Sequence, residues 1–149
     1  MPKRVMTNGK FTGLEFTEKK VFDITFFREI TEEMIEDVIT DGFEGGINYW
    51  CDFINYTDDL LADKTVSINE KPDWMPLSTW CANLIIEGKT IQLYVPDKGK
   101  YYPLNLESIK KGFEMHLKNY PDLYFNGDAD ASDADAIIQY AIFGKVVYS

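Results

Sequence analysis

Two segments decide the fold of this chain: EDVITDGFEGGINYWCDF at Glu36–Phe53 and DADAIIQYAIFGKVVY at Asp133–Tyr148. In each segment, apolar residues recur at helical spacing up to a glycine, and a short apolar run follows. A glycine at the end of such a pattern is typical of a helix terminus. Each segment therefore predicts an amphipathic helix followed by a short strand.

The sequence around these segments predicts one more helix and several strands. The helices are expected to begin at Thr31, Asn105 and Ser132, where a side chain can cap the first turn. Runs rich in β-branched and aromatic residues, and the turn at Gly88 and Lys89, predict the strands. These predicted strands are 21–27, 47–54, 79–87, 90–95, 101–104 and 145–148. We expect an α+β fold in a single domain, residues 1–149, with a mainly antiparallel sheet and about three helices packed on it.

The first predicted helix, over residues 31–43, has two distinct faces. Its apolar positions share one side, so we expect them to be buried. These positions are Met34, Ile35, Val38 and Ile39. We expect Glu32, Glu36 and Asp37 to be exposed on the other side.

Composition limits the class of protein. The chain has 149 residues, of which 45% are hydrophobic and 15% aromatic, enough for a core and too apolar for a disordered protein. No apolar run reaches the roughly 18 residues that a membrane-spanning helix needs. The basic N-terminal residues precede no apolar stretch, so we expect no signal peptide. Two cysteines cannot form a disulfide framework, and we expect reduced thiols in a cytoplasm.

Negative charge is concentrated in two stretches. The formal net charge is −10, and the stretch from Glu29 to Asp63 holds eleven carboxylates without a Lys, Arg or His. Five aspartates lie between Lys118 and Lys145, again without a basic residue. Nucleic-acid binding depends on neutralising phosphates, so this charge disfavours direct contact with nucleic acid.

The aspartates near residue 130 do not form a recognisable calcium loop. An EF-hand loop starting at Asp128 needs glycine at its sixth position and glutamate at its twelfth, where this chain has Asp133 and Gln139. An acidic cluster at a helix N-terminus, favoured by the helix dipole, explains these residues without a metal. We predict no metal site and no cofactor.

The residue types of a thiol hydrolase are present in Cys51, Cys81 and His116. A thiol needs a nearby base to become a nucleophile, and nothing in the local sequence matches a known cysteine signature. Both cysteines neighbour a tryptophan in an apolar run, which is typical of buried thiols. His116 lies beside the apolar stripe of its helix, not on it, and we expect its side chain to be partly exposed. We predict no catalytic residues.

The two segments quoted first resemble the signature segments of a family of small proteins encoded by bacteriophages and prophages. The resemblance implies a phage accessory protein made in the cytoplasm of a bacterial host, and such proteins often counter host immunity. Some similar proteins sequester nucleotide immune signals, and others are acidic inhibitors that occupy nucleic-acid-binding surfaces. The residues that carry the resemblance are Gly45, Gly46, Asn48, Tyr49, Trp50 and Cys51, then Asp133, Asp135, Ile138, Gln139, Tyr140, Phe143, Gly144, Val147 and Tyr148.

The first functional hypothesis is a binding protein that sequesters a small nucleotide, such as a cyclic nucleotide or an ADP-ribose derivative. Trp50 or Tyr49 would stack on the base, and Asn48 and Gln139 would hydrogen-bond its edge. The predicted ligand-binding residues are Asn48, Tyr49, Trp50, Gln139, Tyr140 and Arg28, with Lys89 and Lys100 as further candidates for contacting phosphate.

Two alternatives involve protein partners. In one, the chain is an acidic inhibitor that binds a basic surface of a host defence protein through Glu32, Glu36 and Asp37. In the other, it is a small structural or assembly component of the phage that self-associates as a homo-oligomer through exposed aromatic residues.

Overall fold

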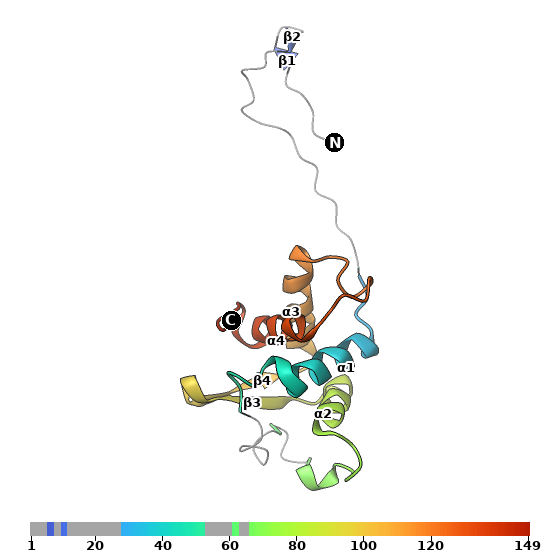
Figure 1. Cartoon of the computed structure of the whole chain (residues 1–149), viewed down its shortest axis with the longest axis vertical. Coiled ribbons are helices and arrows are strands. Elements are labelled where there is room, and N and C mark those ends of the chain that lie inside the picture. The colour runs from blue at the N-terminus through green and yellow to red at the C-terminus, as the bar shows by residue number, and fades with distance from the viewer. Residues whose placement is uncertain (1–5, 8–9, 12–27, 53–60, 63–65) are drawn as a thin grey trace.

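The structure is a computed structural model that describes residues 6–7, 10–11, 28–52, 61–62 and 66–149 (Figure 1). The described residues form an α+β fold, as predicted. The α-helices are α1 (Glu32–Asp41), α2 (Leu77–Ile86), α3 (Leu106–Asn119) and α4 (Ala131–Phe143). The strands are β1 (Met6–Thr7), β2 (Lys10–Phe11), β3 (Ile91–Val95) and β4 (Lys100–Leu104). Shorter helical turns are η1 (Gly42–Gly46, a π-helix), η3 (Ile68–Glu70) and η4 (Pro96–Lys98).

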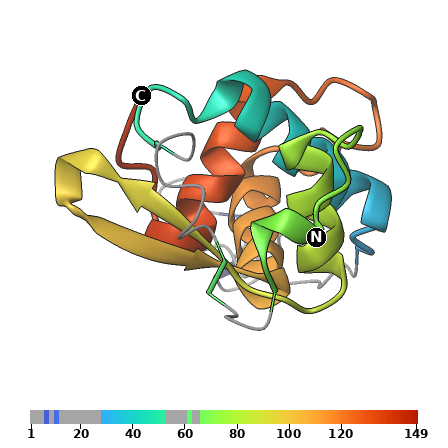
Figure 2. The same ribbon diagram turned by 90° about the horizontal axis from the view of Figure 1, so that it is seen from below.

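Helix α4 is the element around which the others pack. It contacts α3, α1, η1 and β4, while α2 packs on α1 and touches β3 (Figure 2). The β3–β4 hairpin is antiparallel, with Leu93 opposite Tyr102. The sheet is smaller than predicted, because the described strands form only the pairs β1–β2 and β3–β4.

Helix α1 confirms the prediction for residues 31–43. The Thr31 hydroxyl caps it by accepting a hydrogen bond from the Met34 amide at 3.1 Å. Ile35, Val38 and Ile39 are buried beside Met34, with Val38 and Ile39 fully inaccessible. The apolar face is therefore directed into the core, as the helical spacing requires.

Two glycines allow backbone segments to approach α4 closely. A Cβ at Gly46 would lie 2.7 Å from the Ala131 carbonyl oxygen, so the turn after α1 can sit against the start of α4 only without a side chain. A Cβ at Gly112 would meet the Ile137 carbonyl oxygen, which brings α3 equally close to the middle of α4. The first contact brings the end of the α1 segment against the start of α4, and the second brings α3 against its middle.

The predicted strand 79–87 is wrong, because residues 77–86 form helix α2. The helix is buried over most of its circumference, so its apolar residues do not follow a one-sided pattern. Short apolar runs of this kind do not distinguish a strand from a buried helix. The predicted turn at Gly88 and Lys89 therefore ends a helix, and the hairpin turn lies at η4 and Gly99, which has a φ of 63°.

The later elements mostly agree with prediction. Strands 90–95 and 101–104 correspond to β3 and β4, and Asn105 caps α3 by accepting from the Ser108 amide at 3.0 Å. Helix α4 ends at Gly144, whose φ of 75° is left-handed. Its N-cap, however, is Asp130, which forms a capping box with Asp133, so the predicted cap Ser132 lies within the first turn.

Two other predicted strands are also wrong. Residues 47–50 form a turn in which the Trp50 and Cys51 amides both donate to the Ile47 carbonyl oxygen. Residues 145–148 form no strand: Lys145 lies in a bend, and the Val147 and Tyr148 amides bond to the Gln139 side chain. The predicted strand 21–27 and residues 53–54 lie outside the described residues.

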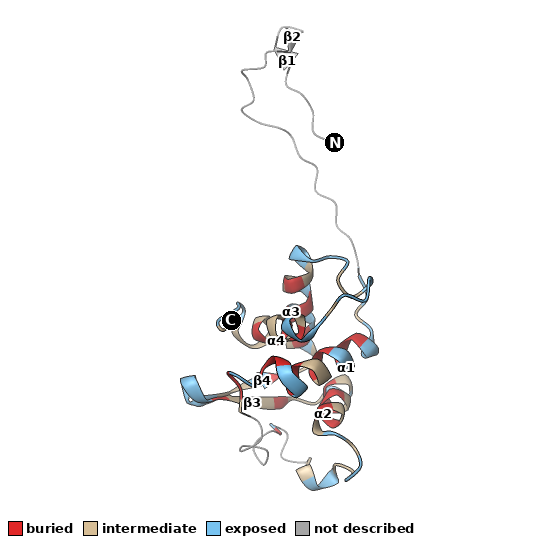
Figure 3. Cartoon of the chain, in the orientation of Figure 1, coloured by how far each residue is buried: buried red, intermediate tan, exposed pale blue. Residues whose placement is uncertain are grey.

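Buried residues of all four helices and of the β3–β4 hairpin form one core cluster (Figure 3). Phe113 of α3, Leu93 of β3 and Ile138 of α4 are among its fully buried members. Among the described helices, none combines the length and apolar character needed to cross a bilayer.

Candidate functional site

The two segments that decide the fold meet at the carboxylate of Asp135. It accepts hydrogen bonds from the Tyr49 hydroxyl at 2.5 Å, the Trp50 indole nitrogen at 2.7 Å and the Gln139 amide nitrogen at 2.8 Å. Partial burial and the bond to Asp135 raise the pKa of Tyr49 to about 12, so its hydroxyl remains a donor at neutral pH. Three donors from two distant segments therefore satisfy a single carboxylate.

Trp50 belongs to the core. Its side chain is 5% exposed, and its ring stacks on that of Tyr148 with centroids 5.6 Å apart and an interplanar angle of 4°. The Phe143 ring packs against it at 5.5 Å. Of the two rings expected to stack on a base, Trp50 is therefore unavailable, while Tyr49 remains exposed.

Gln139 is also enclosed, and its amide binds the C-terminal residues. The side chain is fully buried. Its Oε1 accepts from the backbone amides of Val147 at 2.7 Å and Tyr148 at 2.8 Å, and its Nε2 donates to the Tyr148 carbonyl oxygen at 3.0 Å. The Gln139 amide therefore hydrogen-bonds the backbone of residues 147–148 and is not available to the edge of a base.

An open cleft of about 680 Å³ lies beside this cluster. Exposed Asn48 and Tyr49 line it, so two of the predicted ligand residues do share a surface hollow. The charged residues in its described lining are Asp52 and Asp97, and that lining contains no lysine or arginine. The full lining is Asn48, Tyr49, Trp50, Cys51, Asp52, Pro96, Asp97 and Tyr148.

Arg28 and Tyr140 lie away from the cleft. The Arg28 guanidinium pairs with Asp122 at 3.2 Å and lies 4.6 Å from the centre of the Phe125 ring. The Tyr140 ring points toward α3, where its centre is 6.3 Å from that of His116. The structure thus brings together four of the six predicted ligand residues and separates these two from them.

The two acidic stretches of the sequence also come together. Glu32, Glu36 and Asp37 are exposed on α1, as predicted. Burial, followed by the charges of Asp37, Glu44 and Asp130, raises the pKa of Asp41 above its ordinary value. Carboxylates from the end of α1 therefore face one from the start of α4. We call the exposed side of α1, together with this cluster of carboxylates at its end, the acidic face: Glu32, Glu36, Asp37, Asp41, Glu44 and Asp130.

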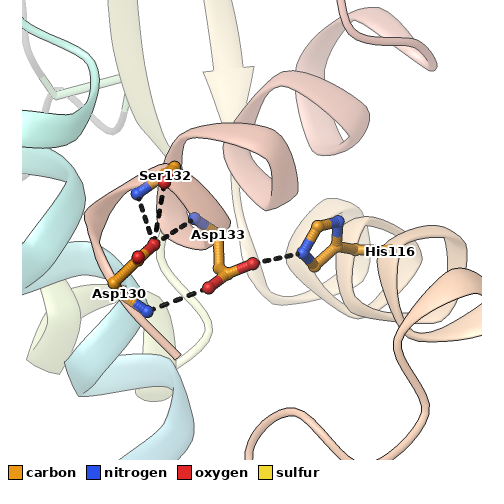
Figure 4. A network of polar contacts seen from close by, with 4 residues as sticks. All are labelled: His116, Asp130, Ser132 and Asp133. Atoms are coloured by element: carbon orange, nitrogen blue, oxygen red, sulfur yellow. Dashed lines mark hydrogen bonds and ion pairs between the residues drawn. The ribbon is translucent and has the colours of Figure 1, made fainter. Parts of the chain in front are cut away.

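The aspartates at the start of α4 cap the helix, and one of them also contacts His116 (Figure 4). Asp130 accepts from the Ser132 amide and hydroxyl, both at 2.9 Å, and Asp133 accepts from the Asp130 amide at 2.9 Å. The other Asp133 oxygen lies 2.9 Å from Nε2 of His116. Since the Ser132 hydroxyl donates to Asp130, Ser132 and His116 do not form a nucleophile–base pair.

The side chains of His116, Cys51 and Cys81 are buried, whereas a catalytic set needs access to its substrate. His116 is 6% exposed, which corrects the expectation that it is partly exposed. Burial raises the pKa of Cys51 and of Cys81 to about 12, so both thiols stay protonated at neutral pH. Within the part of the chain that the structure describes, no group of three or more His, Cys, Asp or Glu residues is arranged to hold a metal ion.

Sequence reasoning missed the role of Asp135. Its spacing of four from Gln139 on a helix places both side chains on one face, which was a usable signal. That this face meets Trp50 and Tyr148 depends on tertiary packing. No family model, curated protein or solved structure matches the chain.

Proposed function

We propose that this protein acts by binding, as a phage accessory protein whose acidic face occupies a basic, nucleic-acid-binding surface of a host defence protein. The phage setting rests on the resemblance of its two signature segments. The mode of binding rests on the acidic face. The observation that supports it best is the convergence of carboxylates from α1 and α4, which raises the pKa of Asp41 through burial and the like charges around it.

Like charges held together reduce stability by a few tenths of a kcal/mol per pair on a helix. Glu32 and Glu36, and likewise Asp37 and Asp41, have this four-residue spacing on α1. A basic partner would relieve the repulsion and would be steered to the surface by long-range attraction. The arrangement therefore suits a surface that docks on a positively charged groove.

The test uses immobilised protein and the DNA-binding fraction of a host-cell extract. We expect it to retain a protein that excess DNA duplex or raised salt releases, because exposed charges are screened over about 10 Å at 0.1 M salt. The triple variant Glu32→Gln, Glu36→Gln and Asp37→Asn should lose this retention.

A matched control neutralises the same number of exposed carboxylates elsewhere: Glu87→Gln, Glu107→Gln and Glu114→Gln. This control should keep the retention. Equal binding by the two triple variants, or retention that DNA does not reverse, would contradict the proposal.

Capture of a small nucleotide in the cleft is a second candidate. Exposed Asn48 and Tyr49 favour it, since they supply polar groups and an aromatic ring. Asp52 and Asp97 oppose it, because they would repel a phosphate. Equilibrium dialysis with ADP-ribose and a cyclic dinucleotide tests it, and Tyr49→Ala should weaken any binding by about 1–3 kcal/mol.

A further inference from the structure

The C-terminal residues occupy a site built from three separate parts of the chain. We call this site the tail clamp: Trp50 after η1, Asp97 in η4, and Asp135 and Gln139 in α4. It holds the backbone of Val147 and Tyr148, whose successive amides both donate to Gln139 Oε1. The site lies beside the cleft and is distinct from the acidic face.

Gln139 directs all but one of its hydrogen bonds at the tail backbone. Its Oε1 accepts from two successive amides, and its Nε2 donates to the Tyr148 carbonyl oxygen and to Asp135. An amide side chain has two donor hydrogens and two acceptor lone pairs, so its capacity is filled. Since these partners are main-chain groups, the bonds to Gln139 require no particular side chain at residues 147 and 148.

The selective part of the tail clamp is an aromatic seat. The Tyr148 ring lies parallel to that of Trp50, with the Phe143 ring 6.0 Å away. The Tyr148 hydroxyl donates to Asp97 at 3.1 Å. This arrangement accepts a flat ring with a hydrogen-bond donor at its tip, which is the side chain of tyrosine.

The side chains before Tyr148 are largely open to solvent. Gly144 ends α4 in a left-handed conformation, and Val146 and Val147 are 45% and 38% exposed. Two open hollows, of about 680 and 580 Å³, adjoin the tail, and both are lined by Tyr49 and Tyr148. A longer peptide seated in the tail clamp would therefore have room to continue beyond it.

We propose that the tail clamp is a peptide-binding site that residues 147–148 fill within their own chain. Its ligand is a segment of a partner protein with tyrosine at the position of Tyr148. The Asp97 carboxylate in the adjoining cleft favours a basic residue next to that tyrosine. The chain's own tail competes at an effective concentration in the millimolar range, so it keeps the site closed to weak ligands.

The test adds the fluorescent peptide KVVYS, the sequence of residues 145–149, to the full-length protein and measures anisotropy. The variant Tyr148→Ala frees the aromatic seat and should bind the peptide at least about tenfold more tightly than the wild type, because tethered competition is lost. The peptide KVVAS should not bind. Adding Gln139→Leu to the variant should abolish binding.

A second variant and a measurement on the wild type keep the proposal falsifiable if Tyr148→Ala unfolds. Val147→Pro removes one amide donor to Gln139 and should also open the site. In the wild type, millimolar KVVYS should speed hydrogen exchange of the Val147 and Tyr148 amides by displacing the tail. Unchanged exchange, or tighter peptide binding by neither folded variant, would overturn the proposal.

Discussion

Asp135 and Asp41 show how differently the two acidic segments of this chain use a carboxylate. Asp135, in the tail clamp, receives three hydrogen-bond donors within 2.8 Å. Asp41, in the acidic face, has the like charges of Asp37, Glu44 and Asp130 around it. The first arrangement stabilises the fold and the second opposes it. The cost of holding these like charges together is the physical basis of the proposed docking role of the acidic face.

The largest expected effect comes from introducing a charge on the buried side of α1, the helix that carries the acidic face. Val38→Asp places an unpaired carboxylate at a fully buried position and should destabilise the protein by about 3 kcal/mol or more. Urea unfolding measures the loss. Glu36→Asp, on the exposed side, is the control and should change little; comparable losses would refute the two-faced description of α1.

The next effect tests the tail clamp. Asp135→Ala leaves the Trp50, Tyr49 and Gln139 donors without their acceptor and should cost about 2–3 kcal/mol. Thermal unfolding with near-ultraviolet circular dichroism follows both stability and the tryptophan environment. Asp128→Ala, at an exposed position near the start of α4, should stay within about 0.5 kcal/mol. A similar small change for Asp135→Ala would show that the network contributes little.

Asp130 lies in the acidic face and also caps α4. Replacing it therefore tests whether the stabilisation by capping outweighs the repulsion between like charges. Asp130→Ala should lose about 1 kcal/mol at pH 7. Hydrogen bonding, first to the Ser132 hydroxyl, lowers the pKa of Asp130 below 3.8. Its stabilisation is therefore present above pH 3.8 and lost as pH falls through the folded-state pKa. Unfolding measured from pH 7 to pH 2 should show the wild-type advantage shrinking; a constant difference would contradict the capping role.

Asp41→Asn should have the smallest effect and the opposite sign, a gain of about 0.5 kcal/mol or less at pH 7. Burial and the neighbouring charges raise the folded-state pKa of Asp41 above 3.8, so the folded protein binds this proton more tightly than the unfolded chain. The gain should be present above the folded-state pKa and vanish as pH falls toward 3.8. Destabilisation at pH 7 would remove the evidence for repulsion in the acidic face.

Local signals predicted the elements whose pattern is one-sided or capped. Thr31, Asn105 and Gly144 marked ends of α1, α3 and α4, and the spacing of Val38 and Ile39 identified a buried face. The same reasoning failed for α2, because a helix buried on most sides has no amphipathic pattern. It also failed for residues 145–148, whose backbone hydrogen-bonds a side chain and not a strand.

The candidate site was only partly readable from the sequence. Asn48, Tyr49, Trp50 and Gln139 were identified together, and they do share one region. The sequence did not decide which of these side chains are buried, since the exposed fraction of a tryptophan in a turn depends on what packs over it. Tyr148 covers Trp50 from nearly one hundred residues away in the chain.

By itself the sequence determined the helix boundaries marked by caps and glycines, the buried face of α1 and the clustering of negative charge, because these depend on neighbours within a few residues. Tertiary structure alone decided that Asp135 receives its three donors, that Gln139 binds the tail and that the charges of Asp41 and Asp130 act on each other. Each of these contacts joins residues far apart in the chain. Their geometry is set by the close approach of α1, α3 and the tail to α4.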